Sequence, residues 1–422
     1  MQKCYNVKRT KINNNNFYSA INKSGVEYMI CKIHFLPALA GDCFVLEFDN
    51  KDCILIDCGY SSTYMEYLRP LLIRLNGEGC RIVLMIVTHI DQDHIQGAVE
   101  FIRENGQVDH FQIIEVQEIW FNGFFNTLFR EPEFNKRVGV TNIEDGKLKK
   151  LQRNLRLQNI GTNGTVSAAD SVSFESLCVK NGYAINASFV DGIAKRDYSS
   201  YEEKKDHTKQ FGDISVRILN PDDKRLHELA NKLDVYLMRC FGKGYCIEKT
   251  EQFAKLFELL RSAKQEIVDS TRKISAGSTD IKSWLNSSKL AAMNAENRAS
   301  IVVEIEYHGY CFLFTGDAES MDWIPYIDKE YSVVKASHHG TTKPNMAMLE
   351  HTQIDKLLIS TNGSKHMRHP DDEFLARAIL GACKELYFNY DIARKNVLIA
   401  QQEQYGYRVH FDEREILIEE QK

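Results

Sequence analysis

The first third of the chain is organised as short apolar runs separated by segments of a different periodicity. The runs at 43–48 (CFVLEF), 52–56 (DCILI) and 82–88 (IVLMIVT) are rich in β-branched and aromatic residues, which favours strands. The last is apolar as far as its final threonine, as a strand covered on both faces would be. Between 64 and 75, leucines at positions 68, 71, 72 and 75 recur at helical spacing. The order strand, helix, strand indicates an α/β fold.

A second β-rich block runs from residue 300 to the end of the chain. Its strand-like runs are SIVVEIE, CFLFT, SVVKA, KLLIS, NVLIA and the alternating YRVHF. The stretch between the two blocks is polar at first, has one short strand at 214–219, and turns helical after Asn220-Pro221. We therefore expect a largely helical insertion that stays outside the sheet core. The predicted units are an arm (1–27), a first half of the fold (28–125), the insertion (126–296) and a second half (297–422).

Composition places the chain among ordinary globular proteins, with 43% hydrophobic and 26% charged residues. The net charge of −5 is small, so no global field points to nucleic acid or to a membrane surface. The eleven cysteines lie singly, without a CxxC pair, which is typical of reduced core residues. No run approaches the ~18 apolar residues of a membrane span, and the start lacks the apolar segment of a signal peptide. We expect a cytoplasmic protein without membrane association.

Ligand-type side chains cluster at the end of the 82–88 run. Asp57 ends an earlier strand, and His89, Asp91, Asp93 and His94 follow within six positions. A lone Asp or His after a strand is most often a helix cap or a solvated loop residue. Four packed together repel one another and lose solvation unless a cation neutralises them. The pattern therefore predicts a metal site at the rim of the sheet.

The second block repeats the layout of an apolar strand followed by a potential ligand. Asp317 follows 312–315, and His338 and His339 follow 332–336. A further strand, 357–360, leads by a loop to His366 and His369. These residues supply a second set of candidate ligands.

In combination, the motifs ILIDCG, THIDQDH, FTGDAE and ASHHGT resemble the metallo-β-lactamase superfamily. The similarity is greatest to the branch that includes the nuclease domain of the competence channel ComEC and phosphorylcholine esterases, which Gly41-Asp42-Cys43 and 297–301 also fit. It covers about 30–125 and 297–415. The resemblance implies a four-layer αββα sandwich, here with the helical insertion between its halves.

The resemblance also implies two divalent metal ions, Zn²⁺ or Mn²⁺ with Fe²⁺ as a further option. The implied ligands are His89, Asp91 and His338 for one ion, Asp93, His94 and His369 for the other, and Asp317 as a bridge. Asp91 replaces the usual second histidine, which moves the preference away from Zn²⁺. Asp57 is expected to support the ligands, and His339 to bind or protonate the leaving oxygen. His366 is the alternative to His369.

Two cations lower the pKa of a shared water and clamp the oxygens of the group under attack, which predicts a metallo-hydrolase. By family resemblance we expect a phosphodiesterase or nuclease. Two alternatives are a hydrolase of esters, lactones or thioesters and a non-catalytic metal-binding regulatory module. The expected partner is a nucleic acid or nucleotide substrate, with an unidentified protein partner as a further option.

A basic run in the insertion is the second sign of such a substrate. Lys149, Lys150 and Arg153 in KLKKLQRNLRL are expected to meet a phosphate backbone, although such a run is also typical of a solvated helix face. The aromatic residues at 120–125 either stack on bases or pack in the core.

Overall fold

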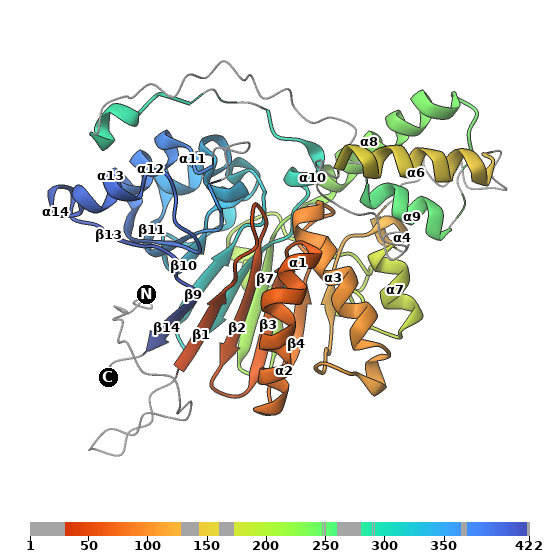
Figure 1. Ribbon diagram of the computed structural model, residues 1–422, viewed down its shortest axis with the longest axis horizontal. Helices are drawn as coiled ribbons and strands as arrows, with labels where there is room; N and C mark the ends of the chain where they lie inside the picture. The colour runs from red at the N-terminus through yellow and green to blue at the C-terminus, as the bar shows by residue number, and fades with distance from the viewer. Residues whose placement is uncertain are drawn as a thin grey trace.

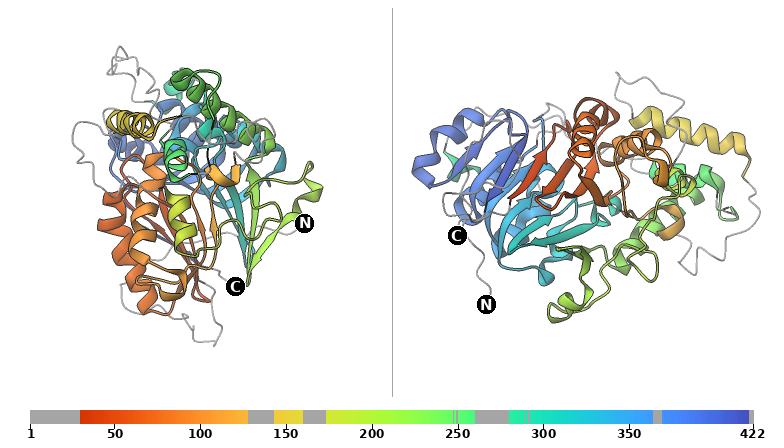
Figure 2. Two further views of the ribbon diagram at one scale, coloured as in Figure 1. Left: turned by 90° about the vertical axis from the view of Figure 1, so that its right-hand side faces the viewer. Right: turned by 90° about the horizontal axis from the view of Figure 1, so that it is seen from below.

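Two β-sheets packed face to face form the centre of the molecule, with helices on their outer sides (Figure 1, Figure 2). The computed structural model describes residues 30–127, 143–159, 173–246, 248, 250–259, 280–288, 290, 292–363 and 369–419. The predicted arm at 1–27 and His366 lie outside these residues. The predicted α/β class and αββα layering are confirmed.

The first sheet has the strand order β14-β1-β2-β3-β4-β5. Its strands are β1 Ile30–Phe35, β2 Cys43–Phe48, β3 Asp52–Cys58, β4 Arg81–Ile86, β5 Ile119–Trp120 and β14 Glu415–Glu419. Strands β3, β4 and β5 are parallel, so a crossover must join β3 to β4. The predicted helix at 64–75 provides it, as a π-helical turn at Tyr64–Leu68 followed by α2 at Arg69–Gly77.

The second sheet has the order β13-β12-β11-β10-β9-β8-β7-β6. Its strands are β6 Lys209–Phe211, β7 Ile214–Asn220, β8 Val302–Tyr307, β9 Tyr310–Phe314, β10 Glu330–Lys335, β11 Gln353–Ile359, β12 Cys383–Phe388 and β13 Arg408–His410. The predicted insertion therefore contributes β6 and β7 to a sheet core that it was expected to avoid. Ile214, Val216 and Ile218 alternate along β7 and are buried in the layer between the sheets.

The described α-helices cover the outer faces of the sheets or form a lobe beside the first sheet (Figure 1). They are α1 Ser61–Thr63, α3 Gln92–Asn105, α4 Phe124–Thr127, α6 Asp145–Asn159, α7 Phe174–Lys180, α8 Asp223–Phe241, α9 Glu251–Glu258, α10 Ala295–Arg298, α11 Thr342–His351, α12 Asp372–Arg377, α13 Lys395–Ala400 and α14 Gln402–Tyr405. The run NVLIA was predicted as a strand but lies in α13. In that helix only Leu398 is buried, and a short apolar run does not distinguish strand from helix by itself.

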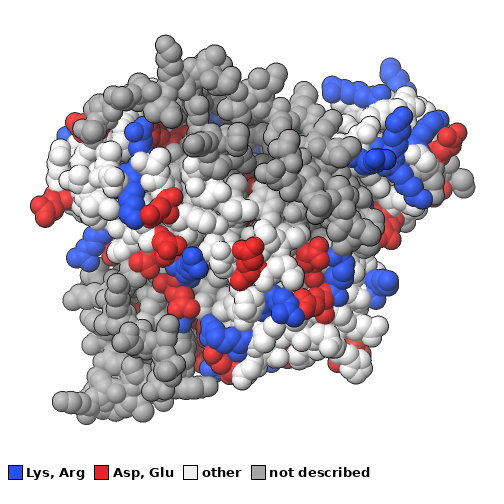
Figure 3. Space-filling model, in the orientation of Figure 1, with Lys and Arg blue, Asp and Glu red and all other residues white. Residues whose placement is uncertain are grey.

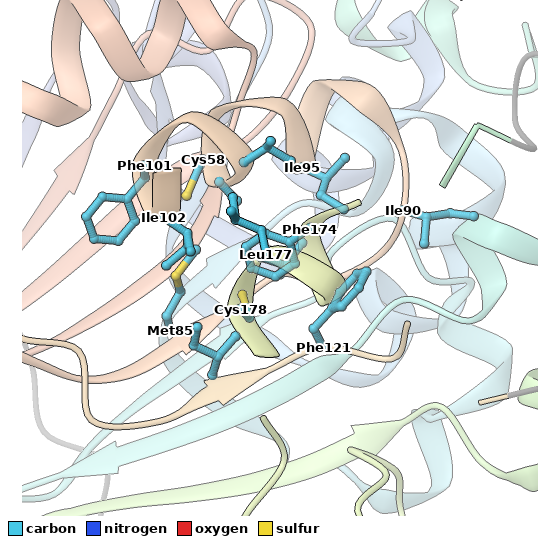
Figure 4. Packing of buried hydrophobic residues seen from close by; sticks show 14 of the residues in the cluster. Cys58, Met85, Ile90, Ile95, Phe101, Ile102, Phe121, Phe174, Leu177 and Cys178 are labelled. Atoms are coloured by element: carbon cyan, nitrogen blue, oxygen red, sulfur yellow. The ribbon is translucent and has the colours of Figure 1, made fainter. Parts of the chain in front are cut away.

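Three apolar layers hold the sandwich together. The layer between the sheets includes Phe44 of β2 and Phe314 of β9, whose ring centroids are 5.3 Å apart. The outer face of the first sheet packs against α3 and α7, where Met85, Phe101 and Leu177 lie close together (Figure 4). A third cluster lies between the second sheet and helices α11 and α12. Among the described residues, no helix combines the length and apolar character that crossing a bilayer requires.

Helices α6, α8 and α9 form a lobe beside the first sheet (Figure 1). Several contacts tie the lobe to the body, and two of them involve α3 and α10. Gln92, at the start of α3, donates a hydrogen bond from Nε2 to the carbonyl oxygen of Glu258 at 3.0 Å. Lys232 of α8 forms an ion pair with the buried carboxylate of Glu296 in α10. Gln92 stands between the candidate ligands Asp91 and Asp93, and Glu296 precedes Asn297, which contacts His338.

Two buried carboxylates cap short helices where the lobe meets the body. Glu175 accepts a hydrogen bond from the backbone N–H of Phe125 in α4, and Glu258 accepts one from that of Phe174 in α7. Burial raises the pKa of each carboxyl from 4.5 to about 7. Hydrogen bonds from backbone N–H groups oppose this shift in both residues. In Glu258 the shift is opposed more strongly by the nearby charge of Lys255. The folded protein therefore holds protons between pH 4.5 and 7 that the unfolded chain has released.

The free energy of unfolding is expected to fall as the pH rises from about 5 to about 8, because the contribution of these carboxyls is lost as they ionise in the folded state. The slope is up to about 1.4 kcal/mol per pH unit for each group. Thermal unfolding of wild type and Glu258→Gln across this range isolates the contribution. A variant with the same pH dependence as wild type would contradict the expectation.

Candidate metal centre

The candidate ligands come from loops that follow β4, β9 and β10. After β4 the chain runs through His89 and Asp91 into α3, whose first turn carries Asp93 and His94. Asp91 stands at the N-cap position, but its side chain makes no capping hydrogen bond with the helix. The backbone N–H of Ile301 donates to the carbonyl oxygen of Thr88 at 2.8 Å, which joins the two sheets at this rim. Residues from both halves of the chain thereby meet in one place.

Asp317 lies at the centre of the cluster. Its Oδ2 atom is 3.6 Å from Nε2 of His339 and 3.7 Å from Nε2 of His94. The same oxygen is 3.9 Å from the Nε2 atoms of His89 and His338. One carboxylate oxygen is thus within 4 Å of four imidazole nitrogens, which come from both sheets.

Among the described residues, four overlapping groups of potential ligands lie around Asp317; two of them include Asp42, which pairs with Lys335, and the other two do not. His89, His94 and Asp317 have potential ligand atoms within 4.8 Å of one another, and Nε2 of His89 is also 3.3 Å from Oδ2 of Asp91. Asp93, His94 and His339 form another such group, with Nε2 of His339 3.8 Å from Oδ2 of Asp93. These two groups have the composition and spacing of metal-ligand sets.

The structure places the later histidines differently from the sequence expectation. His339, expected to act on the leaving oxygen, is in the group with Asp93 and His94, and its side chain is only 2% exposed. His369, expected there as a ligand, has its ring centroid 5.7 Å from that of His338 and 6.3 Å from that of His339, but it belongs to no group of converging ligand atoms found among the described residues. His338 has the most exposed side chain of the histidines around Asp317, at 23%.

Hydrogen bonds fix which ring nitrogen of three histidines points into the cluster. Nδ1 of His339 donates to the carbonyl oxygen of Ser360 at 3.0 Å, since a carbonyl can only accept. Nδ1 of His94 donates to Oδ2 of Asp57 at 2.7 Å. The hydroxyl of Thr88 donates to Asp57, and its oxygen accepts from Nδ1 of His89 at 3.0 Å. In each ring Nε2 is thus the nitrogen that faces the cluster, the position from which a deprotonated imidazole coordinates a metal ion.

An unusual backbone presents the two adjacent histidines. His338 and His339 have φ values of 47° and 57°, and Gly340 continues in the left-handed region at 84°. For the two histidines this conformation costs roughly 1–2 kcal/mol each. Asn345 holds the turn, because its side chain bonds the backbone N–H and carbonyl of Ser337 and the carbonyl of Thr341. Such strain is typical of functional sites.

Electrostatic coupling in the cluster is strong. Burial alone would raise the pKa of Asp317, but His339, His94 and Lys335 outweigh it and hold that pKa well below its usual range. Burial would lower the pKa of His94, whereas Asp57 and Asp317 raise it to about 10. Without metal, His94 therefore holds a proton that a metal ion has to displace.

The side chains present fit a pair of divalent cations. Nε2 of His89, His94 and His339 and Oδ2 of Asp317 are buried atoms without a hydrogen-bond partner, which is costly unless something else satisfies them. Five carboxylates here are no more than 1% exposed: Asp42, Asp57, Asp91, Asp93 and Asp317. Two divalent ions would compensate most of that charge.

Three residues of the cluster were not identified as site residues from the sequence. Asp42 and Lys335 form a buried ion pair beside Asp317, and Nδ2 of Asn297 is 3.4 Å from Nε2 of His338. A single lysine in an otherwise apolar strand such as SVVKA was the one visible signal for Lys335. Asp42 and Asn297 lay in segments that fit the family branch but carried no assigned role.

The predicted substrate-binding residues lie on α6, in the lobe formed by α6, α8 and α9 (Figure 1). Lys149, Lys150 and Arg153 are exposed, and basic side chains gather over this part of the surface (Figure 3). Lys150 also lines an open cavity of about 450 Å³ between α6 and α8. Trp120, Phe121 and Phe124 are buried in the core, so these rings do not offer a stacking surface.

Comparison with known protein families agrees with the metal-ligand geometry in the first half of the chain. Residues 36–168, less than half of the chain, match the family model of the Metallo-beta-lactamase superfamily, whose members are largely hydrolytic metalloenzymes. The match includes His89, Asp91, Asp93 and His94. No curated protein matches the sequence.

Three solved structures are similar to the chain at 9% identity. The metallo-beta-lactamase fold protein YhfI from Bacillus subtilis covers 93% of this chain and 100% of its own, with a TM-score of 0.33. The match to a mutant of the CmlA beta-hydroxylase covers 92% of this chain and 53% of the hydroxylase, with a TM-score of 0.31. The match to a protein of unknown function from Enterococcus faecalis V583 covers 92% of this chain and 70% of that protein, with a TM-score of 0.25. These likenesses are too weak to bear on activity.

Proposed function

From the superfamily match and the cluster around Asp317, we propose that the protein is a two-metal phosphodiesterase that acts on nucleic acid or a nucleotide. One observation carries the proposal. A single buried carboxylate oxygen faces four imidazole nitrogens, and in three of these rings the other nitrogen is occupied by a hydrogen bond. A structural histidine cluster has no need for this shared orientation, whereas metal ligands require it.

In this proposal the ligands divide around Asp317. His89 and Asp91 would hold one ion and Asp93, His94 and His339 the other, with Asp317 placed between the two sets. Bound there, the ions would lower the pKa of water and stabilise charge on phosphoryl oxygens. Asp57 orients His94 directly and His89 through Thr88.

His338 is the residue proposed to meet the substrate. Its side chain is the partly exposed one, so it can bind the phosphoryl group or protonate the leaving oxygen. Asn297 lies beside it and restrains its ring. This assignment exchanges the roles that the sequence suggested for His338 and His339.

Phosphodiesters are favoured over carboxylic esters by the ligand set. Asp91, Asp93 and Asp317 supply hard oxygen ligands, which suit Mn²⁺ better than an all-histidine set would. Charge on a phosphodiester spreads over non-bridging oxygens, which two cations can stabilise together. No feature of the described residues favours an ester, lactone or thioester.

The proposal is tested with purified protein loaded with Mn²⁺ or Zn²⁺. Hydrolysis of bis-p-nitrophenyl phosphate is compared with that of p-nitrophenyl acetate and a p-nitrophenyl thioester. We expect preferential cleavage of the phosphodiester, abolished by a chelator and restored by metal. Faster turnover of the ester or thioester would favour the other class of hydrolase, and two bound ions without any turnover would favour a regulatory module.

Asp91→His is expected to keep a metal site and to shift its preference toward Zn²⁺, because imidazole is the softer ligand. Competition between Mn²⁺ and Zn²⁺ measured by metal analysis gives the preference of each protein. An unchanged or reversed preference would show that Asp91 does not coordinate.

Reversing the charges of Lys149, Lys150 and Arg153 is expected to weaken cleavage of a polynucleotide and to leave hydrolysis of bis-p-nitrophenyl phosphate nearly unchanged. Each lost phosphate contact removes counterion release, so the salt dependence of polynucleotide binding falls as well. The matched control reverses three exposed lysines elsewhere: Lys180, Lys205 and Lys224. Equal loss of activity on both substrates, or no loss on either substrate, would rule out a substrate role for α6.

A further inference from the structure

A buried lysine forms part of the wall of the metal centre. Lys335 is the last residue of β10, and its side chain is 1% exposed. Its Nζ donates to the carbonyl oxygen of Gly316 at 2.7 Å and forms an ion pair with Asp42. Nζ also lies 3.4 Å from Oδ1 of Asp317. The three donors of the ammonium group are thus directed at three oxygens of the cluster.

The two carboxylate oxygens of Asp317 face different partners. Oδ1 faces Lys335, while Oδ2 faces the four imidazole nitrogens. The backbone N–H of Asp317 also donates to the hydroxyl of Ser300 at 3.3 Å, which restrains the main chain at this residue. Because the two oxygens are equivalent, the Lys335 contact fixes the orientation of the carboxylate, with one oxygen held by the lysine and the other facing the imidazoles.

The charge of the cluster gives Lys335 a second role. Five buried carboxylates carry five negative charges, and two divalent ions supply four positive ones. Lys335 supplies the fifth, from a buried position in contact with both Asp42 and Asp317. The protein therefore places a cationic side chain of its own where a buried charge would otherwise be left uncompensated.

We infer that Lys335 is a positioning residue of the metal centre, which makes Asp317 a ligand through Oδ2 alone and thereby allows one oxygen to contact both ions. The inference rests on the proposed two-metal function. It assigns to the Asp42–Lys335 pair a role in placing the second ion, beyond satisfying buried charge.

If Lys335 had a purely structural role, its removal would have a different outcome from the one that the inference predicts. Lys356, on the neighbouring strand β11, is also 1% exposed and has its Nζ 3.7 Å from Oε1 of Glu385, a residue outside the metal centre. If buried lysines serve only to stabilise the sheet, removal of either one should affect stability alone. If the inference holds, Lys335 should affect metal binding and Lys356 should not.

The test uses the double variant Lys335→Met with Asp42→Asn, which removes one charge of each sign and so leaves the net charge unchanged. Mn²⁺ binding is measured by calorimetry, and the electron paramagnetic resonance spectrum of the loaded protein reports whether the two ions share a bridge. We expect wild type to give a spin-coupled pair. The double variant should bind the second ion about 10–100-fold more weakly and give uncoupled Mn²⁺ signals.

Two further variants keep the result interpretable. Lys356→Met is the matched control and should retain the coupled spectrum, whatever its thermal stability. Lys335→Gln, which keeps a hydrogen-bond donor without the charge, should show the same weakening if the double variant fails to fold. A double variant, or Lys335→Gln, with wild-type affinity and coupling would overturn the inference while leaving the two-metal function intact. Fewer than two ions in wild type would overturn both.

Discussion

Asp317→Asn is expected to lower kcat/KM for bis-p-nitrophenyl phosphate by on the order of 10³-fold, the largest effect of any single substitution considered. An amide keeps the size of the side chain but loses the charge that faces His89, His94, His338 and His339. Without that charge, neither ion retains its shared ligand, and water activation at both is weakened. Steady-state kinetics at saturating Mn²⁺ measure the loss.

Asp355→Asn provides the control for this substitution. Asp355 lies on β11 and pairs with the exposed Lys384, outside the metal centre, so activity should stay close to wild type. Circular dichroism of both variants separates lost chemistry from lost folding. Activity of Asp317→Asn within about tenfold of wild type would remove the basis for a shared carboxylate, since a single such contact is worth more than that.

His94→Ala and His339→Ala are each expected to lower the metal content of the protein from about two ions per chain to about one. Both imidazoles turn Nε2 toward Asp317, and both belong to the group that contains Asp93. His369→Ala should retain about two ions, because His369 belongs to none of the groups of converging ligand atoms found among the described residues. Metal analysis after dialysis gives the three stoichiometries.

The metal contents of the His339 and His369 variants decide which of these two histidines is a ligand. Loss of an ion from His369→Ala together with full content in His339→Ala would restore the assignment suggested by the sequence. Activity is expected to fall with the metal content, so the His94 and His339 variants should lose hydrolysis by at least about 100-fold. His89→Ala should also lower the metal content, through the other group.

The sequence alone identified the parts of this site that lie close together along the chain. His89, Asp91, Asp93 and His94 occupy six positions after an apolar strand, and the geometry of a strand that runs into a helix brings them together. Asp317 and the His338-His339 pair were found for the same reason, because each follows its own strand. Strand period and apolar burial are local properties, so they also predicted the α/β class.

Pairing between distant strands was decided only in the tertiary structure. β7 joins the second sheet beside β8, and β14 returns to the first sheet beside β1. The alternating apolar residues of such strands show that one face is buried, but they do not say against which partner. The insertion boundary drawn from the sequence therefore separated β6 and β7 from the sheet they belong to.

The roles of individual side chains also depended on the three-dimensional arrangement. His338 and His339 are adjacent and chemically identical, and only their left-handed backbone and the Ser360 carbonyl turn His339 inward and leave His338 partly exposed. Asp42 and Lys335 lie in opposite halves of the chain, so no spacing rule connects them to Asp317. Local sequence determined which residues stand at strand ends, whereas the direction of each side chain followed from long-range packing and hydrogen bonds, because those contacts select one rotamer among several.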